Sequence, residues 1–374
     1  MLAKNKRKRI LIDDVPSQKQ PKNHSIFAWN FSEEKKNQFE AIDNEDIDIG
    51  SEEESDSDDE TDDESTTIIM NGPYGEPHEL QKEYNKAKDL RGEVFFISTI
   101  GYESGIKPKI KAELEVCGGN LYALLMGESQ PNYFVGQDNN EAYYRLSSPV
   151  NFAAEGEDIF KFNRPINRFI FSLVISYFLG DNDISNIGVV KRDQQLLVVR
   201  IDPECCFSEF FLHPFHNQLE QVQAELNFLN QLNIDNTANK DVLGQFLEKE
   251  KNVEFFRSCF NHKLLINKAS LELLSSSAKN IELEDALNTI IKTPIGDYEE
   301  IIDRTISDLN KRDEIKKALI NRVKIFTEAW NSMLKKREEH LGESNHSHRL
   351  FSANQKTNSR ISFDEPYLTR GPLS

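Results

Sequence analysis

The period of the hydrophobic residues changes near the middle of the chain. Before residue 150 the apolar runs are short and rich in β-branched and aromatic residues, at 93–100, 132–135 and 142–146. Such runs are typical of β-strands. In 166–178, and again in 315–333, apolar residues recur every three or four positions, which is typical of helices. The chain therefore predicts an α+β fold in which a small strand-rich part precedes a larger helical part.

Each part is expected to contain one element of the other kind. Apolar residues at helical intervals between residues 110 and 125 predict a helix among the strands, weakened or kinked by Gly118 and Gly119. In the helical part, 187–190 and 196–201 read as two strands joined by a polar turn. A β-hairpin is therefore expected directly after the first helix of the second part.

An acidic segment separates the start of the chain from the part expected to fold. Between residues 43 and 64 there are fourteen Asp and Glu and no Lys or Arg, and without them the formal charge changes from −18 to −4. Such a segment buries too little apolar surface to offset the entropy lost on ordering. The sequence predicts a disordered tail at 1–70, basic and then acidic, folded regions at 71–150 and 151–343, and a flexible C-terminal tail at 344–374.

Composition excludes several classes of protein. Acidic residues exceed basic ones by 63 to 45, which argues against a nucleic-acid-binding body. The longest apolar stretch, 169–179, is too short for the ~20 residues of a spanning helix. The four cysteines lack both metal-ligand spacing and the density of a disulfide scaffold, which favours a reducing, intracellular compartment.

Three polar residues flank the predicted hairpin. Asp181 and Asn186 precede its first strand, and Asp202 follows its second strand, so all three are expected at the same end of the strands. Phosphoryl transfer to a hydroxyl requires a carboxylate that positions the acceptor and oxygen ligands for Mg²⁺. Two other readings remain. Asp181 and Asp183 are also typical of a helix end and turn, and they resemble the start of a calcium loop, although its later Gly and Glu positions do not match.

The segment Leu-Gly-Asp181-x4-Asn186-Ile-Gly, followed after a short hairpin by Ile-Asp202, resembles the catalytic loop and metal-binding element of the protein-kinase-like superfamily. The likeness is to its atypical members, namely aminoglycoside and choline kinases, phosphatidylinositol kinases and kinase-like effectors of intracellular bacterial pathogens. The resemblance implies a two-lobed fold with a strand-rich N-lobe and a helical C-lobe. It also implies Asp181 as the catalytic residue, with Asp183 in reserve, and Asn186 and Asp202 as metal ligands.

Further matches lie upstream and are shorter. The stretch with Lys107, Lys109, Lys111 and Glu113 resembles the phosphate-binding Lys and its partner Glu, and Leu146 lies in a segment that resembles the hinge that contacts the nucleotide. The chain departs from the family in having no His-Arg pair before the loop Asp, Pro instead of Phe after the metal-binding Asp, and no Gly-x-Gly-x-x-Gly loop. The segment 101–105 is a weak substitute for that loop.

The resemblance implies an atypical kinase that uses ATP and Mg²⁺, or Mn²⁺, to phosphorylate a hydroxyl, with a protein as the first expected acceptor. The three lysines also suggest activation by an inositol phosphate or another host polyanion. The alternative is a pseudokinase that acts as a binding scaffold. The charged stretch 335–343 resembles the glutamate-rich export signals of type IV-secreted effectors, which implies translocation from a bacterium into host cytoplasm.

Overall fold

The computed structural model describes residues 66–71, 77–101, 106–127, 129–155, 159, 166–250, 252–260, 268–276 and 278–352. Side chains are described up to residue 339, except at 209–210 and 268–270. The chain divides into two units, Met1–Asp62 and Asp63–Ser374, and every described residue belongs to the second. The predicted tail at 1–70 therefore lies almost wholly outside the described residues, as do 102–105 of the substitute glycine loop and the end of the C-terminal tail.

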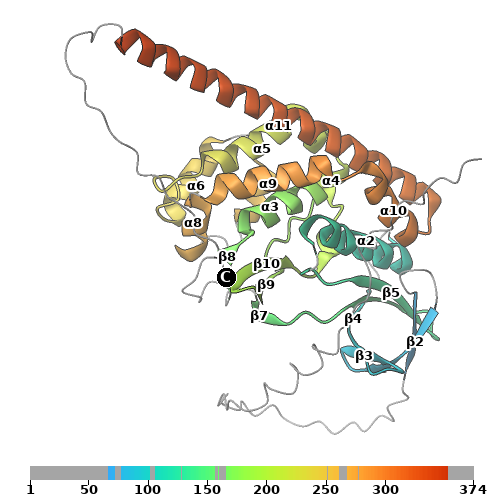
Figure 1. Cartoon of the computed structure of the whole chain (residues 1–374). Helices are drawn as coiled ribbons and strands as arrows, with labels where there is room; N and C mark the ends of the chain where they lie inside the picture. Colours follow the sequence, from blue (N-terminus) through green and yellow to red (C-terminus); the bar gives the residue numbers. More distant parts are fainter. Residues whose placement is uncertain are drawn as a thin grey trace, which may run out of the picture. The chain divides into compact units, whose positions relative to one another are not determined.

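The first lobe is a barrel of antiparallel strands (Figure 1). Its strands are β1 (Thr67–Asn71), β2 (Pro77–Glu83), β3 (Lys86–Asp89), β4 (Val94–Thr99), β5 (Tyr133–Asp138) and β6 (Tyr143–Ser147), and they close in the order β1-β2-β3-β4-β6-β5. Alternate residues point inward, as the period of a strand requires. The interior is apolar and is formed by Ile68, Met70, Leu80, Ala87, Phe95, Phe134, Tyr144 and Leu146.

Helix α2 (Pro108–Met126) runs between β4 and β5 in the sequence and packs against the barrel. The pair Gly118 and Gly119 lies within this continuous helix. These glycines instead allow close contact, because a Cβ on Gly118 would lie 2.5 Å from the Cβ of Cys206, and one on Gly119 would lie 2.2 Å from the ring of Tyr133. The sequence pattern predicted the helix but not the purpose of its glycines.

A second, smaller sheet joins the barrel to the helices. Its strands are β7 (Phe152–Glu155), β8 (Ile166–Asn167), β9 (Ile187–Arg192) and β10 (Gln195–Arg200), in the order β7-β9-β10-β8. The predicted hairpin is confirmed as β9 and β10, which pair antiparallel. Its two turn residues, Asp193 and Gln194, have φ of 48° and 66°, the left-handed backbone that the favoured two-residue hairpin turns require.

The remaining chain is helical, which confirms the α+β arrangement. The helices are α3 (Phe169–Leu179), α4 (Glu209–Leu212), α5 (Leu219–Gln231), α6 (Lys240–Lys249), α7 (Phe255–Phe260), α8 (Lys268–Ser275), α9 (Ala278–Lys292), α10 (Ile295–Thr305) and α11 (Leu309–Ser352), with short 3₁₀ turns η3 (Pro203–Cys205) and η4 (Pro214–Asn217). Two elements cross predicted boundaries, since β1 begins before residue 70 and α11 continues beyond residue 344. In the part of the chain that the structure describes, no helix is both long and apolar enough to cross a membrane.

Helix α3 is buried along its whole length, and both of its ends are capped by charged side chains from other helices. At its N-terminus Glu282 of α9 accepts hydrogen bonds from the backbone N–H groups of Arg168 (2.6 Å) and Ile170 (2.8 Å). At its C-terminus Arg322 of α11 donates to the carbonyls of Tyr177 and Phe178 at 2.5 and 2.8 Å. Each charge opposes the partial charge of that helix end, so α3 is fixed by side chains distant in the sequence.

Replacing Arg322 by Met should destabilise the protein by roughly 2 to 4 kcal/mol, because buried acceptors at the end of α3 and Oδ1 of Asn217 would lose their donor. Urea unfolding followed by circular dichroism measures the change. The control is Lys335→Met on the same helix, since the Lys335 side chain is 78% exposed. Equal unfolding midpoints for Arg322→Met and wild type would contradict this role.

Glu225 predicts a pH dependence of stability. Its carboxylate accepts hydrogen bonds from the backbone N–H groups of Glu254, Phe255 and Phe256 at the start of α7, and burial raises its pKa from 4.5 to about 7. The folded state therefore holds this proton more tightly than the unfolded state, and the resulting stabilisation is complete below pH 4.5 and lost as the pH rises through 7.

Unfolding free energies of wild type and Glu225→Gln, measured between pH 5 and pH 8, should show this difference. Relative to the variant, wild type should lose up to about 3 kcal/mol as the pH rises, because Gln cannot titrate. Comparison with the variant cancels the contribution of other titrating groups. Parallel curves for the two proteins would show that Glu225 does not cause the slope.

Candidate functional site

The site begins with the loop that connects α3 to β9. Gly180 ends α3 with φ of 68°, and a Cβ at this position would lie 2.6 Å from the Cβ of Phe211 and 2.8 Å from its backbone nitrogen. Glycine is therefore required twice, by the left-handed backbone and by the close contact. The turn directs the next residues, Asp181 and Asp183, back toward the sheet.

Asp181 has no exposed surface, and other groups contact its carboxylate. Its Oδ2 accepts hydrogen bonds from Nη2 of Arg200 at 2.7 Å and from the hydroxyl of Tyr122 at 2.8 Å. Its Oδ1 accepts one from the backbone N–H of Asp183 at 3.2 Å. Burial, and then the negative charge of Asp181, raise the pKa of Tyr122, which therefore stays protonated as a donor.

Arg200 joins the loop to strand β10. Besides the ion pair with Asp181, its Nη2 donates to the carbonyl oxygen of Asp183 at 2.8 Å. Burial alone would lower the pKa of Arg200, but the charge of Asp181 raises it above the usual value. The guanidinium group thus fixes two points of the loop relative to the strand that leads to Asp202.

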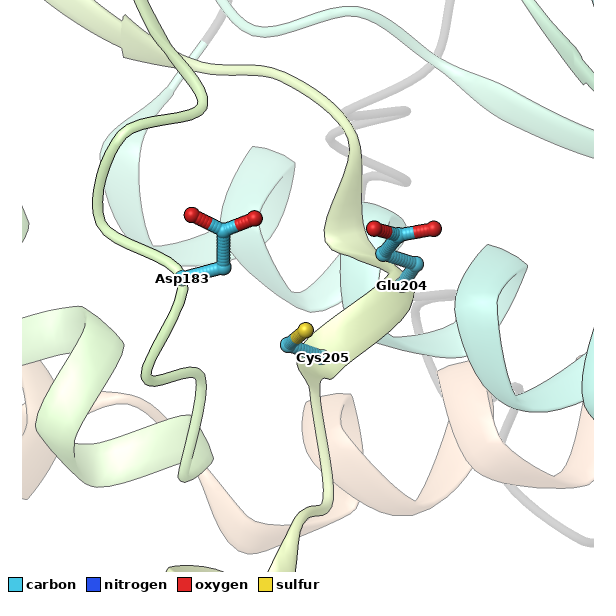
Figure 2. Close-up of side chains that lie close together, drawn as sticks. All are labelled: Asp183, Glu204 and Cys205. Atoms are coloured by element: carbon cyan, nitrogen blue, oxygen red, sulfur yellow. The ribbon is translucent and has the colours of Figure 1, made fainter.

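Asp183 is the loop carboxylate that remains half-buried. Its Oδ1 accepts a hydrogen bond from the Ser185 hydroxyl at 2.5 Å, and its Oδ2 accepts one from Nδ2 of Asn186 at 3.0 Å. A ligand atom of Asp183 lies within 4.8 Å of one on Glu204 and one on Cys205. In Figure 2 the carboxylates of Asp183 and Glu204 point in the same direction, with the Cys205 sulfur below them.

Asp202 lies where β10 ends and η3 begins, with φ of 51°. Nη1 of Arg145, on β6, contacts Oδ1 of Asp202 and also donates to Oε2 of Glu115 on α2 at 2.9 Å. Nη2 of the same side chain donates to the Ser98 hydroxyl on β4 at 3.0 Å. A single buried cation therefore connects the barrel, α2 and the end of the hairpin.

The charges around this point affect one another. Burial raises the pKa of Glu115 and of Glu204, and for Glu204 the neighbouring Asp202 raises it further. Burial, and then Asp181, raise the pKa of Cys205 to about 12, which disfavours the thiolate that metals bind. The available ligands are carboxylate and amide oxygens, which suit Mg²⁺ or Mn²⁺.

The structure brings four predicted site residues together: Asp181, Asp183, Asn186 and Asp202. Nδ2 of Asn186 donates to Oδ2 of Asp183 and lies 3.5 Å from the carbonyl oxygen of Asp202, so it joins the two sides of the hairpin. The arrangement predicted from spacing alone, with Asp181, Asn186 and Asp202 at one end of two strands, is therefore present. The structure differs from the prediction at Asp181, whose carboxylate is fully buried.

Of the residues predicted from the upstream matches, only Lys111 lies near the acids of the site. Glu113 accepts hydrogen bonds from the backbone N–H and the hydroxyl of Ser307, so it faces the connection between α10 and α11. The exposed Lys109 lies 3.8 Å from Glu113. Lys107 is exposed, whereas the charge of Lys111 lowers the pKa of both Glu115 and Glu204. Leu146 is fully buried in the barrel interior.

Sequence reasoning missed Arg145, Glu115, Glu204 and Arg200. Two of them carried a usable signal, because Arg145 and Arg200 are cations inside strands that are otherwise apolar at the buried positions. A charge in such a place is costly unless it is paired, which predicts nearby acids. The pairing of Ser98 with Arg145 depends on strand register and had no such signal.

Comparison with known proteins gives little further information. No protein-family model matches the chain, and no curated protein matches it. Among solved structures, the proinflammatory kinase CtkA of Helicobacter pylori is similar over 66% of this chain and 93% of that chain, with a TM-score of 0.37 and 12% sequence identity. A likeness this distant assigns no activity and no residue role.

The two loop carboxylates should respond differently to substitution. Asp181→Ala should destabilise the protein by about 3 to 5 kcal/mol, because it leaves the buried charge of Arg200 unpaired. Asp183→Asn should leave the unfolding midpoint close to that of wild type. Chemical unfolding measures both, and the double variant Asp181→Ala, Arg200→Met should recover part of the loss. An Asp181→Ala variant as stable as wild type would show that the ion pair does not hold the loop.

Proposed function

We propose that the protein is a kinase-like phosphotransferase that transfers the terminal phosphate of ATP to a hydroxyl group. One observation carries the proposal: Arg145 contacts both Glu115 and Asp202, directly beside the loop that contains Asp183 and Asn186. A nucleoside triphosphate is bound and positioned by a cation that an acid on a helix holds in place, next to carboxylates that can bind a metal. This arrangement supplies those groups.

In this proposal Arg145 binds the phosphates, and Glu115 positions it. The bonds to Glu115 and Ser98 fix the guanidinium, whose fork of donors suits phosphate oxygens. Lys111, with its electrostatic effect on Glu115 and Glu204, is the second cation of the site. Both replace Lys107 and Lys109 as candidates, because those two side chains face solvent or Glu113.

Asp183 is our candidate for the carboxylate that orients the acceptor hydroxyl. A general base must come within hydrogen-bonding distance of its substrate, and Asp181 has no exposed surface and is already bonded to Arg200 and Tyr122. The hydrogen bonds from Ser185 and Asn186 hold the Asp183 side chain in place. Asp181 then acts as a positioning residue for the loop.

The donor set suits a divalent cation of the hard type. Asn186 donates through Nδ2, which leaves its Oδ1 for a ligand. The carboxylate of Glu204 lies near that of Asp183, and we assign Asp202 and Glu204 as the further ligands beside Asn186. These three residues would hold Mg²⁺ or Mn²⁺, which would neutralise phosphate charge during transfer. We propose that the acceptor is a protein hydroxyl. Activation by a polyanion stays part of the proposal, because Lys111 supplies a positive charge for a polyanion to bind.

Phosphate transfer from γ-labelled ATP tests the proposal. Asp202→Asn should abolish transfer, and Asp183→Asn should lower the rate by roughly 10² to 10⁴, the usual contribution of a positioned acid or base. Arg145→Met should weaken the binding of ATP with Mg²⁺ as well as the rate. The assay is run with and without heat-treated eukaryotic cell extract, so that dependence on an activator is visible.

Asp303→Asn is the matched control, because this aspartate pairs with Lys316 on the surface. It should transfer phosphate at the wild-type rate. Wild-type rates in both Asp183→Asn and Asp202→Asn would contradict the assigned site. Nucleotide binding that does not depend on Mg²⁺, with no transfer under any condition, would favour the pseudokinase scaffold.

A further inference from the structure

A second site candidate is a polar cavity in the helical lobe. Its lining comes from α5 and the loop after it, from α6, from the end of α8 and from the start of α9. Both α5 and α8 contact α9 (Figure 1). The cavity opens widely to solvent, and its volume of about 680 Å³ is within the range of small-molecule sites. It is lined by Asn230, Gln231, Leu232, Asn233, Asn236, Phe246, Ser275, Ser276, Lys279 and Asn280. None of these residues belongs to the phosphotransfer site.

Lys279 is the charged residue of this cavity, and it is only 4% exposed. Its Nζ donates to the carbonyl oxygen of Asn230 at 2.9 Å and to that of Leu232. Among the described residues no carboxylate pairs with it, and burial lowers its pKa. Two carbonyls use two of the three N–H donors of an ammonium group. Both carbonyls lie at the C-terminal end of α5, whose dipole offsets part of the ammonium charge, and an anionic ligand in the cavity would offset the rest.

The surroundings of Lys279 also favour an anion. Helix α9 begins at Ala278, so Lys279 and Asn280 lie in its first turn, where the helix dipole is positive. No acidic residue is among those that line the cavity. Ser276 and Asn280 add donor groups at the same place. The buried ammonium, the dipole of α9 and the absence of acids in the lining all favour an anion, and Lys279 itself covers the carbonyls of Asn230 and Leu232 at the negative end of α5.

The remaining lining indicates what the anion is attached to. Amide side chains of Asn233, Asn236 and Gln231 offer donors and acceptors together, which pair well with hydroxyl groups. The cavity is much larger than one phosphate ion, and its single ammonium group suits one phosphate better than several. We propose that this cavity binds a small polyol that carries a single phosphate, of the sugar monophosphate class.

Binding is tested on the full-length protein by titration calorimetry and by thermal shift with three probes: glucose 6-phosphate, inorganic phosphate and glucose. Glucose 6-phosphate should raise the melting temperature and give saturable heat. Inorganic phosphate should bind at least tenfold more weakly, and glucose should not bind detectably. These measurements use neither ATP nor phosphate transfer, so their outcome does not depend on whether the proposed kinase function is correct.

The decisive variant is Asn280→Asp, which places a negative charge in the cavity at an exposed position. An acid in the first turn of a helix is favourable to folding, so lost binding would not reflect unfolding. Glucose 6-phosphate should bind at least tenfold more weakly to this variant. Asn310→Asp is the control, since Asn310 is exposed in the first turn of α11, outside the cavity.

Lys279→Met provides a second test and should also reduce binding at least tenfold. If glucose 6-phosphate does not bind the wild-type protein, or binds Asn280→Asp as well as wild type, the proposal is wrong. Equal affinity for inorganic phosphate and glucose 6-phosphate would overturn the assignment of the polyol. Loss of binding in both cavity variants, with the Asn310→Asp control unchanged, would support it.

Discussion

The buried ion pair between Asp181 and Arg200 is the interaction on which the geometry of the candidate site depends. It links the loop after α3 to the strand that ends near Asp202, and the same guanidinium also holds the carbonyl of Asp183. Two nitrogens of Arg200, Nε and Nη1, are buried with no partner among the described residues. A pair with unsatisfied donors adds little net stability. The ion pair therefore serves mainly to fix positions. The Arg200 side chain holds the loop that contains Asp183 in place relative to the strand end that leads to Asp202.

The position of that loop depends in turn on α3. Every residue of this helix is buried and most of them are apolar, so apolar packing gives its rotation and axial position little direction. Glu282 and Arg322 supply the missing directional contacts at its two ends. Because α9 and α11 carry these side chains, the last third of the chain determines where the loop at 180–186 lies. The loop residues of the site lie close together in the sequence, but the side chains that hold the loop in place come from distant segments.

The sequence predicted the elements better than their contacts. The change of hydrophobic period predicted the order of strands and helices, and the hairpin at β9 and β10 followed from alternation and a polar turn. Spacing also placed Asp181, Asn186 and Asp202 at one end of that hairpin. Spacing could not distinguish Asp181 from Asp183, because burial of the first depends on Arg200 and Tyr122, one of them far away in the sequence.

The position of Arg145, the proposed phosphate-binding cation, shows still more clearly that spacing in the sequence does not determine which residues meet. The sequence resemblance favoured Glu113 as the acid that pairs with the phosphate-binding lysine. In the structure Glu113 faces Ser307, whereas Glu115, two residues further along α2, faces Arg145. Residues two apart on a helix point in different directions, so the choice depends on helix rotation. That rotation is set by Gly118 and Gly119, which let α2 approach Cys206 and Tyr133 so closely that a side chain at either position would collide. The cation then comes from β6, because β6 pairs with β4 and places Arg145 opposite Ser98. Three separate packing contacts thus decide which charged residues meet.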